Sequence, residues 1–137
     1  MLNFEIDSAV LTSRVPRGTE LDFWEGRCLV SVVGFQFLNT RVFGVAIPFH
    51  RNFEEVNLRF YVRRKADDGW RRGVVFVKEI VPRVAIAAVA RWLYNEPYVA
   101  LPMSHELRRD EGGLRSVEYA WGRGDERAAL HVTVSGN

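Results

Sequence analysis

The chain has 137 residues, of which 47% are hydrophobic and 26% are charged, as expected for one soluble globular domain with a single core. It contains no apolar run near the roughly 20 residues that span a bilayer, and its first residues lack the pattern of a signal peptide. The net charge is only +2 and basic residues are interspersed with acids, so neither a membrane nor a nucleic acid is an expected partner.

The first third of the chain predicts short strands joined by turns. We expect a strand over Asn3–Asp7, a brief helix over Ser8–Thr12, and strands over Arg27–Phe37 and Arg41–Ile47. Gly34 falls inside one of these strands. A glycine there indicates either a bulge or the close approach of another segment.

The segment Glu54–Arg63 alternates strictly between apolar and polar residues, which is typical of a half-buried strand. One face carries Val56, Leu58, Phe60 and Val62. The other face carries Glu55, Asn57, Arg59, Tyr61 and Arg63. Glu55 and Arg59 would lie roughly 13 Å apart along the strand. The alternation alone is compatible with a solvated sheet face or with the lining of a ligand site.

The second half of the chain predicts a hairpin, a helix and further strands. The hairpin pairs Glu54–Arg64 with Arg72–Val81 through a loop with turn chemistry. A helix is expected over Val84–Tyr94, after Pro82. Three strands should follow, over Val99–Leu107, Leu114–Trp121 and Ala128–Ser135. The expected fold is therefore a single α+β domain over residues 1–137, with a mainly antiparallel sheet curled into a barrel. The last strand would leave an exposed edge, which either a partner or further polypeptide would cover.

Few side chains carry recognisable chemistry. With Cys28 as the single cysteine no internal disulfide can form, and we expect a buried apolar thiol in a cytoplasmic protein. The spacing of His50, His105 and His131 matches no metal motif, and no P-loop or dinucleotide fingerprint is present, so no metal and no cofactor are expected. His50, which leads into the polar strand, is the best candidate among them for a general acid or base.

The register of the predicted hairpin decides which of two neighbouring residues joins the polar face. If Phe60 lies opposite Phe76, Glu79 belongs to that face. A shift by one residue places Lys78 there instead, and the sequence leaves both open. Lys78 would be either a surface lysine or, in an apolar pocket, a Schiff-base lysine.

Several blocks of the sequence together resemble the YqjF-like proteins, a bacterial family of unknown function. The blocks are Gly18–Asp22, Val32–Phe35, Pro48–Arg51, Phe53–Val62, Arg72–Phe76 and Leu101–Met103. The resemblance implies the fold of acetoacetate decarboxylase, a β-barrel with a ligand cavity, and a C-terminal segment that this chain lacks. Glu55 corresponds roughly to an active-site glutamate of that enzyme. Tyr98 and Val99 stand where the enzyme has its paired lysines, so the resemblance does not imply decarboxylation through an imine.

Three functional hypotheses follow. The first is binding of a small anionic or carbonyl ligand in the cavity by residues of the polar face and its surroundings. The candidate ligand-binding residues are Glu55, Asn57, Arg59, Tyr98, His50 and Lys78. The second is a lyase, hydratase or cyclase in which Glu55 or His50 is the base and Arg59 binds an oxyanion. The third is an interaction module that recruits a partner, or a second copy of the chain, through its exposed edge.

Overall fold

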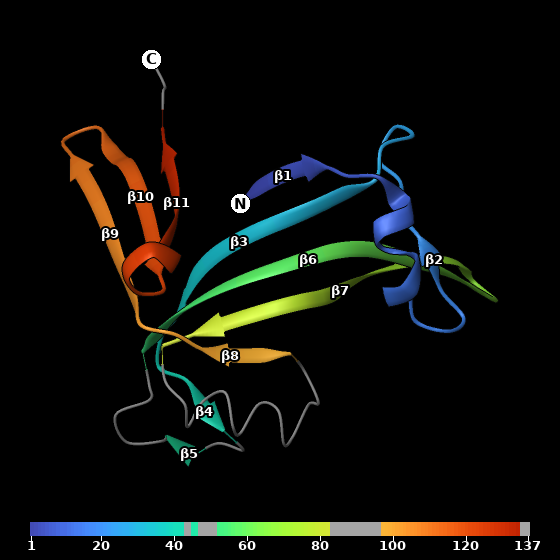
Figure 1. Ribbon diagram of the computed structural model, residues 1–137, viewed down its shortest axis with the longest axis horizontal. Helices are drawn as coiled ribbons and strands as arrows, with labels where there is room; N and C mark the ends of the chain where they lie inside the picture. The colour runs from blue at the N-terminus through green and yellow to red at the C-terminus, as the bar shows by residue number, and fades with distance from the viewer. Residues whose placement is uncertain (43–44, 47–51, 83–96, 135–137) are drawn as a thin grey trace. The chain divides into compact units, whose positions relative to one another are not determined.

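The computed structural model describes residues 1–42, 45–46, 52–82 and 97–134, and its regular structure there is mostly strand (Figure 1). The strands are β1 (Leu2–Glu5), β2 (Glu20–Leu21), β3 (Leu29–Phe37), β4 (Arg41–Val42), β5 (Val45–Ala46), β6 (Phe53–Ala66), β7 (Gly69–Val81), β8 (Tyr98–Ala100), β9 (Met103–Asp110), β10 (Gly113–Trp121) and β11 (Ala128–Thr133). The helical elements within these ranges are the 3-10 turns η1 (Ser8–Val10), η2 (Thr12–Arg14) and η3 (Gly124–Glu126). The helix predicted over 84–94 lies outside the described residues, as does His50.

The strands form three sheets, and the predicted barrel is wrong. Six strands make one sheet in the order β1-β3-β6-β7-β8, with β2 also paired to β6, while β11-β10-β9 and β4-β5 form separate sheets. A barrel requires the two edge strands to pair with each other. In the described ranges, β1 pairs only with β3, and the three-residue strand β8 pairs only with β7. The mainly antiparallel character is confirmed, since β7–β8 is the one parallel pair with a described register.

Other local predictions are confirmed with different boundaries. β6 and β7 are neighbours in the sheet, and Gly69 follows their short turn with a φ of 124°. The brief helix predicted near Ser8 is the pair of 3-10 turns, begun by Asp7, whose carboxylate accepts a hydrogen bond from the Ala9 N–H at 2.9 Å. The predicted strand 99–107 is divided at Leu101–Pro102 into β8 and β9. No helix in the described part of the chain has the length and apolar character needed to cross a membrane.

The chain divides into two compact units. The first unit comprises Met1–Val33 and Asn57–Lys78, and the second comprises Gly34–Val56 and Glu79–Asn137. The core of the first unit is built on four buried side chains, Leu11, Cys28, Phe60 and Val62. Partly buried apolar residues pack around them: Ile6, Val15, Leu21, Val30, Val75 and Val77. This core lies on the apolar face that the alternation of β6 predicts.

The second unit has a smaller core around Phe53 and Val81, which Phe37 and Tyr98 contact. Its sheet β9–β10–β11 approaches β3 at Gly34. A Cβ atom built on Gly34 would lie only 2.6 Å from the ring of Tyr119. Of the two alternatives predicted at this glycine, the structure shows the close approach, and a side chain there would require the ring of Tyr119 to shift.

Candidate ligand-binding site

In the first unit, the polar face of β6 lies opposite the core. Phe60 and Val62 are buried in the core at 0% and 6% exposure, and Tyr61 between them points to the other face. There the Ser31 hydroxyl donates a hydrogen bond to Oδ1 of Asn3 at 2.6 Å. Because this uses the single hydroxyl hydrogen of Ser31, the Tyr61 hydroxyl must be the donor in its own 2.6 Å contact with Ser31. The network leaves the amide N–H groups of Asn3 as donors on this face.

A pocket of about 670 Å³ opens on this polar face of the first unit. Its walls combine polar, aliphatic and aromatic residues. They are Asn3, Asp22, Phe23, Trp24, Leu29, Tyr61, Arg72, Gly73 and Val74. The volume lies within the range of roughly 300–1,000 Å³ that is usual for small-molecule sites.

One wall of the pocket is a tight hairpin that presents two aromatic rings. Trp24 and Arg27 exchange two backbone hydrogen bonds of 2.9 Å. The residues between them, Glu25 and Gly26, have φ angles of 49° and 80°, as a two-residue hairpin turn requires. The hairpin leaves the side chains of Phe23 and Trp24 exposed at 44% and 57%. These rings are therefore held by local backbone geometry and not by burial.

Asp22 and Arg72 supply the charges of the pocket. The Nε atom of Arg72 lies 3.1 Å from Oδ2 of Asp22, and the two side chains are 68% and 10% exposed. The backbone N–H of Asp22 donates to the Tyr61 carbonyl at 3.0 Å, which fixes the carboxylate beside β6. Its Oδ1 atom is buried and accepts no hydrogen bond from any described residue. Leaving a buried acceptor unsatisfied costs about 1–3 kcal/mol.

The structure places the predicted site residues in different units. Asn57, Arg59 and Lys78 belong to the first unit. Asn57 is buried at 2% exposure, and a terminal nitrogen of Arg59 lies 3.7 Å from the sulfur of Met1. Lys78 is exposed. None of these three lines the pocket, whose one contribution from β6 is Tyr61.

Glu55 and Tyr98 lie together in the second unit, and neither lines the pocket of the first unit. The Tyr98 hydroxyl donates to Oε2 of Glu55 at 3.2 Å. Tyr98 is also the backbone partner of Glu79 in the parallel pair β7–β8. Glu55 and Glu79 are each 2% exposed, so the solvated-face interpretation does not hold at Glu55. Of the pair left open by the register, Glu79 is buried and Lys78 is not.

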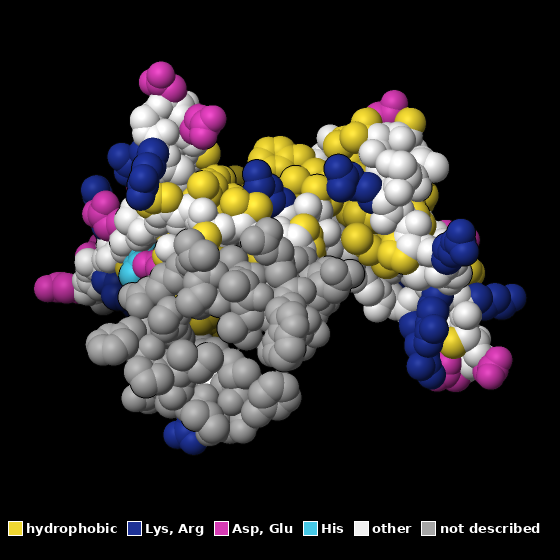
Figure 2. All heavy atoms as spheres, turned by 60° about the horizontal axis from the view of Figure 1, so that its bottom comes forward, with side chains coloured by type: hydrophobic (Ala, Val, Ile, Leu, Met, Phe, Trp, Pro, Cys, Tyr) yellow, Lys and Arg dark blue, Asp and Glu magenta, His cyan; other side chains and the backbone are white. Residues whose placement is uncertain are grey.

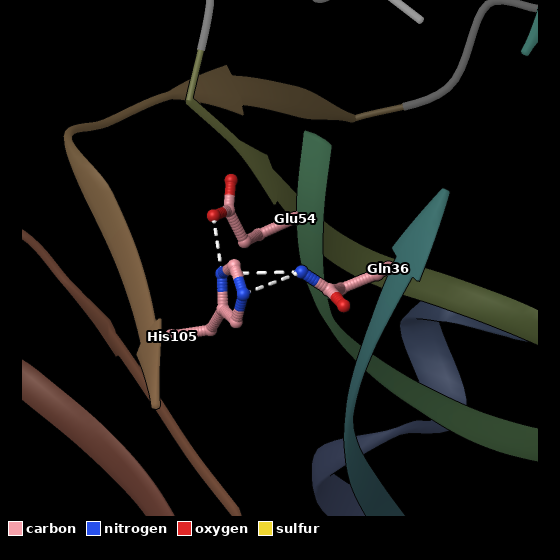
Figure 3. A network of polar contacts seen from close by, with 3 residues as sticks. All are labelled: Gln36, Glu54 and His105. Carbon is pink, nitrogen blue, oxygen red and sulfur yellow. Dashed lines mark hydrogen bonds and ion pairs between the residues drawn. The ribbon is translucent and has the colours of Figure 1, made fainter. Parts of the chain in front are cut away.

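A second polar cluster joins Gln36, Glu54 and His105 in the second unit (Figure 3). His105 Nδ1 lies 2.6 Å from Oε1 of Glu54, and its Nε2 lies 2.7 Å from Nε2 of Gln36. Nδ1 therefore carries the hydrogen and donates to the carboxylate, while Nε2 accepts from the amide. A carboxylate that orients a histidine is typical of proton-transfer sites, but here Gln36 occupies the nitrogen that a substrate would need. We interpret the cluster as a tie between β3, β6 and β9.

Local sequence patterns do not predict these contacts. Glu54 and His105 are 51 residues apart and Gln36 and His105 are 69 residues apart, so no local spacing relates them. The same holds for Asp22 and Arg72. The hairpin next to Asp22 does carry a local signal, because Gly26 stands at a position that needs positive φ. In the described part of the chain, no group of three or more acidic, histidine or cysteine residues is arranged to hold a metal ion.

Cys28 is buried in the core of the first unit, as the sequence predicts. Burial, and to a lesser extent the charge of Asp7, raises the pKa of its thiol above the usual value. A higher pKa lowers the fraction of reactive thiolate at any given pH. We expect Cys28 to react with a disulfide reagent at pH 8 far more slowly in the native chain than in urea. Equal rates in the two states would contradict this placement.

Acidic and basic side chains are mixed on the face of the molecule shown in Figure 2, where hydrophobic side chains also reach the surface. The exposed apolar residues of the first unit include Phe23, Trp24 and Val74. All three line the pocket described above. Exposed apolar side chains gathered around a hollow are typical of a binding site.

Comparison with known proteins identifies the family. The family model DUF2071, described as an uncharacterized conserved protein, matches residues 1–137. The uncharacterized protein YqjF of Bacillus subtilis (strain 168) is 30% identical over 132 residues, which cover 95% of this chain and 51% of that relative. The chain therefore spans about half the length of this relative. The YqjF-like resemblance seen in the sequence is confirmed, and the chain belongs to the DUF2071 family of uncharacterised conserved proteins.

Proposed function

We propose that the chain binds a small organic ligand with a carboxylate or carbonyl group in the pocket of the first unit. The observation that carries this proposal is a preformed hollow that is lined by both hydrogen-bond donors and exposed aromatic rings. Arg72 and Asn3 provide the donors, and Phe23 and Trp24 provide the rings. The ligand class is the one that the sequence predicts. The residues that hold it differ, with Arg72 taking the role first assigned to Arg59.

Arg72 is the main anchor in this proposal. Its Nε faces Asp22, and its terminal nitrogens have no ion pair with any other described residue. A guanidinium carries five N–H donors in a fixed fork, so one edge can remain with Asp22 while another binds a carboxylate or carbonyl oxygen. Asn3 adds a neutral donor, oriented by Ser31. These groups would fix the polar end of the ligand.

The apolar part of the ligand would lie against the hairpin. Phe23 and Trp24 are exposed in the free chain, and covering apolar surface contributes about 25 cal/mol per Å² removed from water. Leu29 and Val74 continue this apolar surface inside the pocket. The proposed ligand therefore has an apolar or aromatic body and one polar end.

Replacing Arg72 by glutamine tests the anchor. We expect R72Q to weaken the binding of 3-phenylpropanoate about tenfold, since one charge-assisted hydrogen bond contributes about 1.5 kcal/mol or more. The affinity for the uncharged ketone 4-phenyl-2-butanone should fall less on the same substitution. Affinity is measured by titration calorimetry, and chemical-shift changes should centre on the Trp24 indole.

Arg71→Gln is the matched control for this experiment. Arg71 also pairs with an aspartate, Asp68, at 3.0 Å, but it is exposed and does not line the pocket. R71Q should therefore bind both compounds as the unchanged chain does. The proposal fails if neither compound binds, or if R71Q and R72Q weaken the binding equally.

A further inference from the structure

We infer that the ligand is an α-amino acid with an apolar side chain, bound as a zwitterion between Asp22 and Arg72. This inference rests on the proposed function and adds the second charge. Asp22 and Arg72 are the only charged residues among those described that line the pocket, so the formal charges of the lining sum to zero. An anion alone would leave the occupied pocket with a net negative charge. A zwitterion satisfies both residues and keeps the pocket neutral.

The carboxylate of Asp22 is the group that would bind a cationic part of the ligand. It is nine-tenths buried, and its Oδ1 has no hydrogen-bond partner in the described part of the chain. An ammonium group is the donor best matched to a buried carboxylate, because the hydrogen bond is charge-assisted. Oδ1 has almost no accessible surface in this conformation, so the side chains around the carboxylate, including that of Arg72 beside Oδ2, have to shift before a ligand reaches Oδ1. Arg72 is 68% exposed, which leaves it room to do so.

The spacing of the charges fits an α-amino acid. Nε of Arg72 lies 3.1 Å from Oδ2 of Asp22 before any shift, so a ligand that pairs with both residues after a small displacement of Arg72 carries its two charges close together. In an α-amino acid the ammonium and the carboxylate are attached to the same carbon atom. The remaining substituent of that carbon would point to the wall formed by Phe23 and Trp24, which is apolar and exposed. An apolar side chain follows from this placement.

Three compounds with the same phenyl group separate the contributions of the two charges. L-phenylalanine carries both, 3-phenylpropanoate carries only the carboxylate, and phenethylamine carries only the ammonium group. We expect phenylalanine to bind the unchanged chain about tenfold more tightly than either of the others at pH 7, in line with one added charge-assisted hydrogen bond. If 3-phenylpropanoate or phenethylamine binds as tightly as phenylalanine, the zwitterion inference is overturned while the proposed function stands. If none of the three binds, the zwitterion inference is overturned, and the proposed function fails as well if 4-phenyl-2-butanone also does not bind.

Asp22→Asn tests whether Asp22 causes the tighter binding of phenylalanine. Asp68→Asn is the matched control. Asp68 also pairs with an arginine, but it is 69% exposed and lies outside the pocket. D22N should bind phenylalanine and 3-phenylpropanoate with similar affinity, and D68N should retain the tenfold preference. Retention of the preference in D22N would overturn the assignment. The three compounds are compared on the unchanged chain. Their comparison therefore still tests the zwitterion inference if D22N folds poorly.

Discussion

Phe60→Ala is expected to lower the free energy of unfolding by about 3–5 kcal/mol, the range for removing a phenylalanine from a packed core. Phe60 has no exposed surface, and it belongs to the same core cluster as Leu11, Cys28 and Val62. The loss combines the transfer free energy of the ring with the cavity that remains after partial relaxation. Urea unfolding followed by circular dichroism measures it. The free energy of unfolding of a typical domain is only about 5–15 kcal/mol in total, so F60A should unfold at a much lower urea concentration than the unchanged chain.

Phe23→Ala is the control for this measurement, because it removes the same side chain from the surface. Phe23 is 44% exposed and lines the pocket. Its replacement should change stability by no more than about 0.5 kcal/mol. It should nevertheless weaken the binding of 3-phenylpropanoate, since the apolar wall is lost. Equal destabilisation by F60A and F23A would show that the core of the first unit is not where the structure places it.

Gly34→Ala is expected to destabilise the chain by about 1–3 kcal/mol, the usual cost of forcing an extra methyl group into a packed region. The new Cβ would lie 2.6 Å from Cδ2 and 3.0 Å from Cγ of Tyr119, and 3.2 Å from a methyl group of Leu130. Tyr119 is buried, so its ring has little room to move away. The strain should therefore remain in the folded state, and urea unfolding measures it.

Gly73→Ala makes the same change in another strand where there is space. A Cβ atom at Gly73 meets nothing nearer than a methyl group of Val62 at 3.9 Å, an ordinary contact. Since alanine restricts the unfolded chain more than glycine does, G73A should be neutral or stabilising by up to about 1 kcal/mol. If both variants behave alike, the approach of Tyr119 to β3 is not the reason for the glycine at position 34.

Local patterns in the sequence predict much of the fold correctly. The alternation along β6 separates Phe60 and Val62 from Tyr61, and the structure buries the first two and exposes the third to the pocket. The hairpin β6–β7 and the meander β9–β10–β11 were also predictable, because turn residues separate their strands. The barrel was not a local pattern. It was expected from the order of many strands with one helix and from a family resemblance, and the edge strands β1 and β8 do not pair with each other.

The site was harder to predict, because its residues come from five separate segments of the chain. Asp22 is held by the backbone of Tyr61, and Arg72 reaches it from β7. Arg59 was the more obvious candidate, since it lies on the same strand face as Tyr61, yet it does not line the pocket. Which arginine meets a buried carboxylate depends on the neighbouring segments, and strand register cannot be read from one strand alone.

The family, the mainly antiparallel strands and the face of β6 that carries polar groups can all be read from the residues alone. These follow from residue identity and from a period of two, which act over a few neighbouring residues. Three features become clear only in the folded chain: the edge strands β1 and β8 do not pair, Glu79 is buried while Lys78 is exposed, and Asp22, Arg72 and an aromatic hairpin line one pocket. These outcomes depend on contacts between segments that are distant in sequence. The free energies of such contacts are set by packing and not by local propensity.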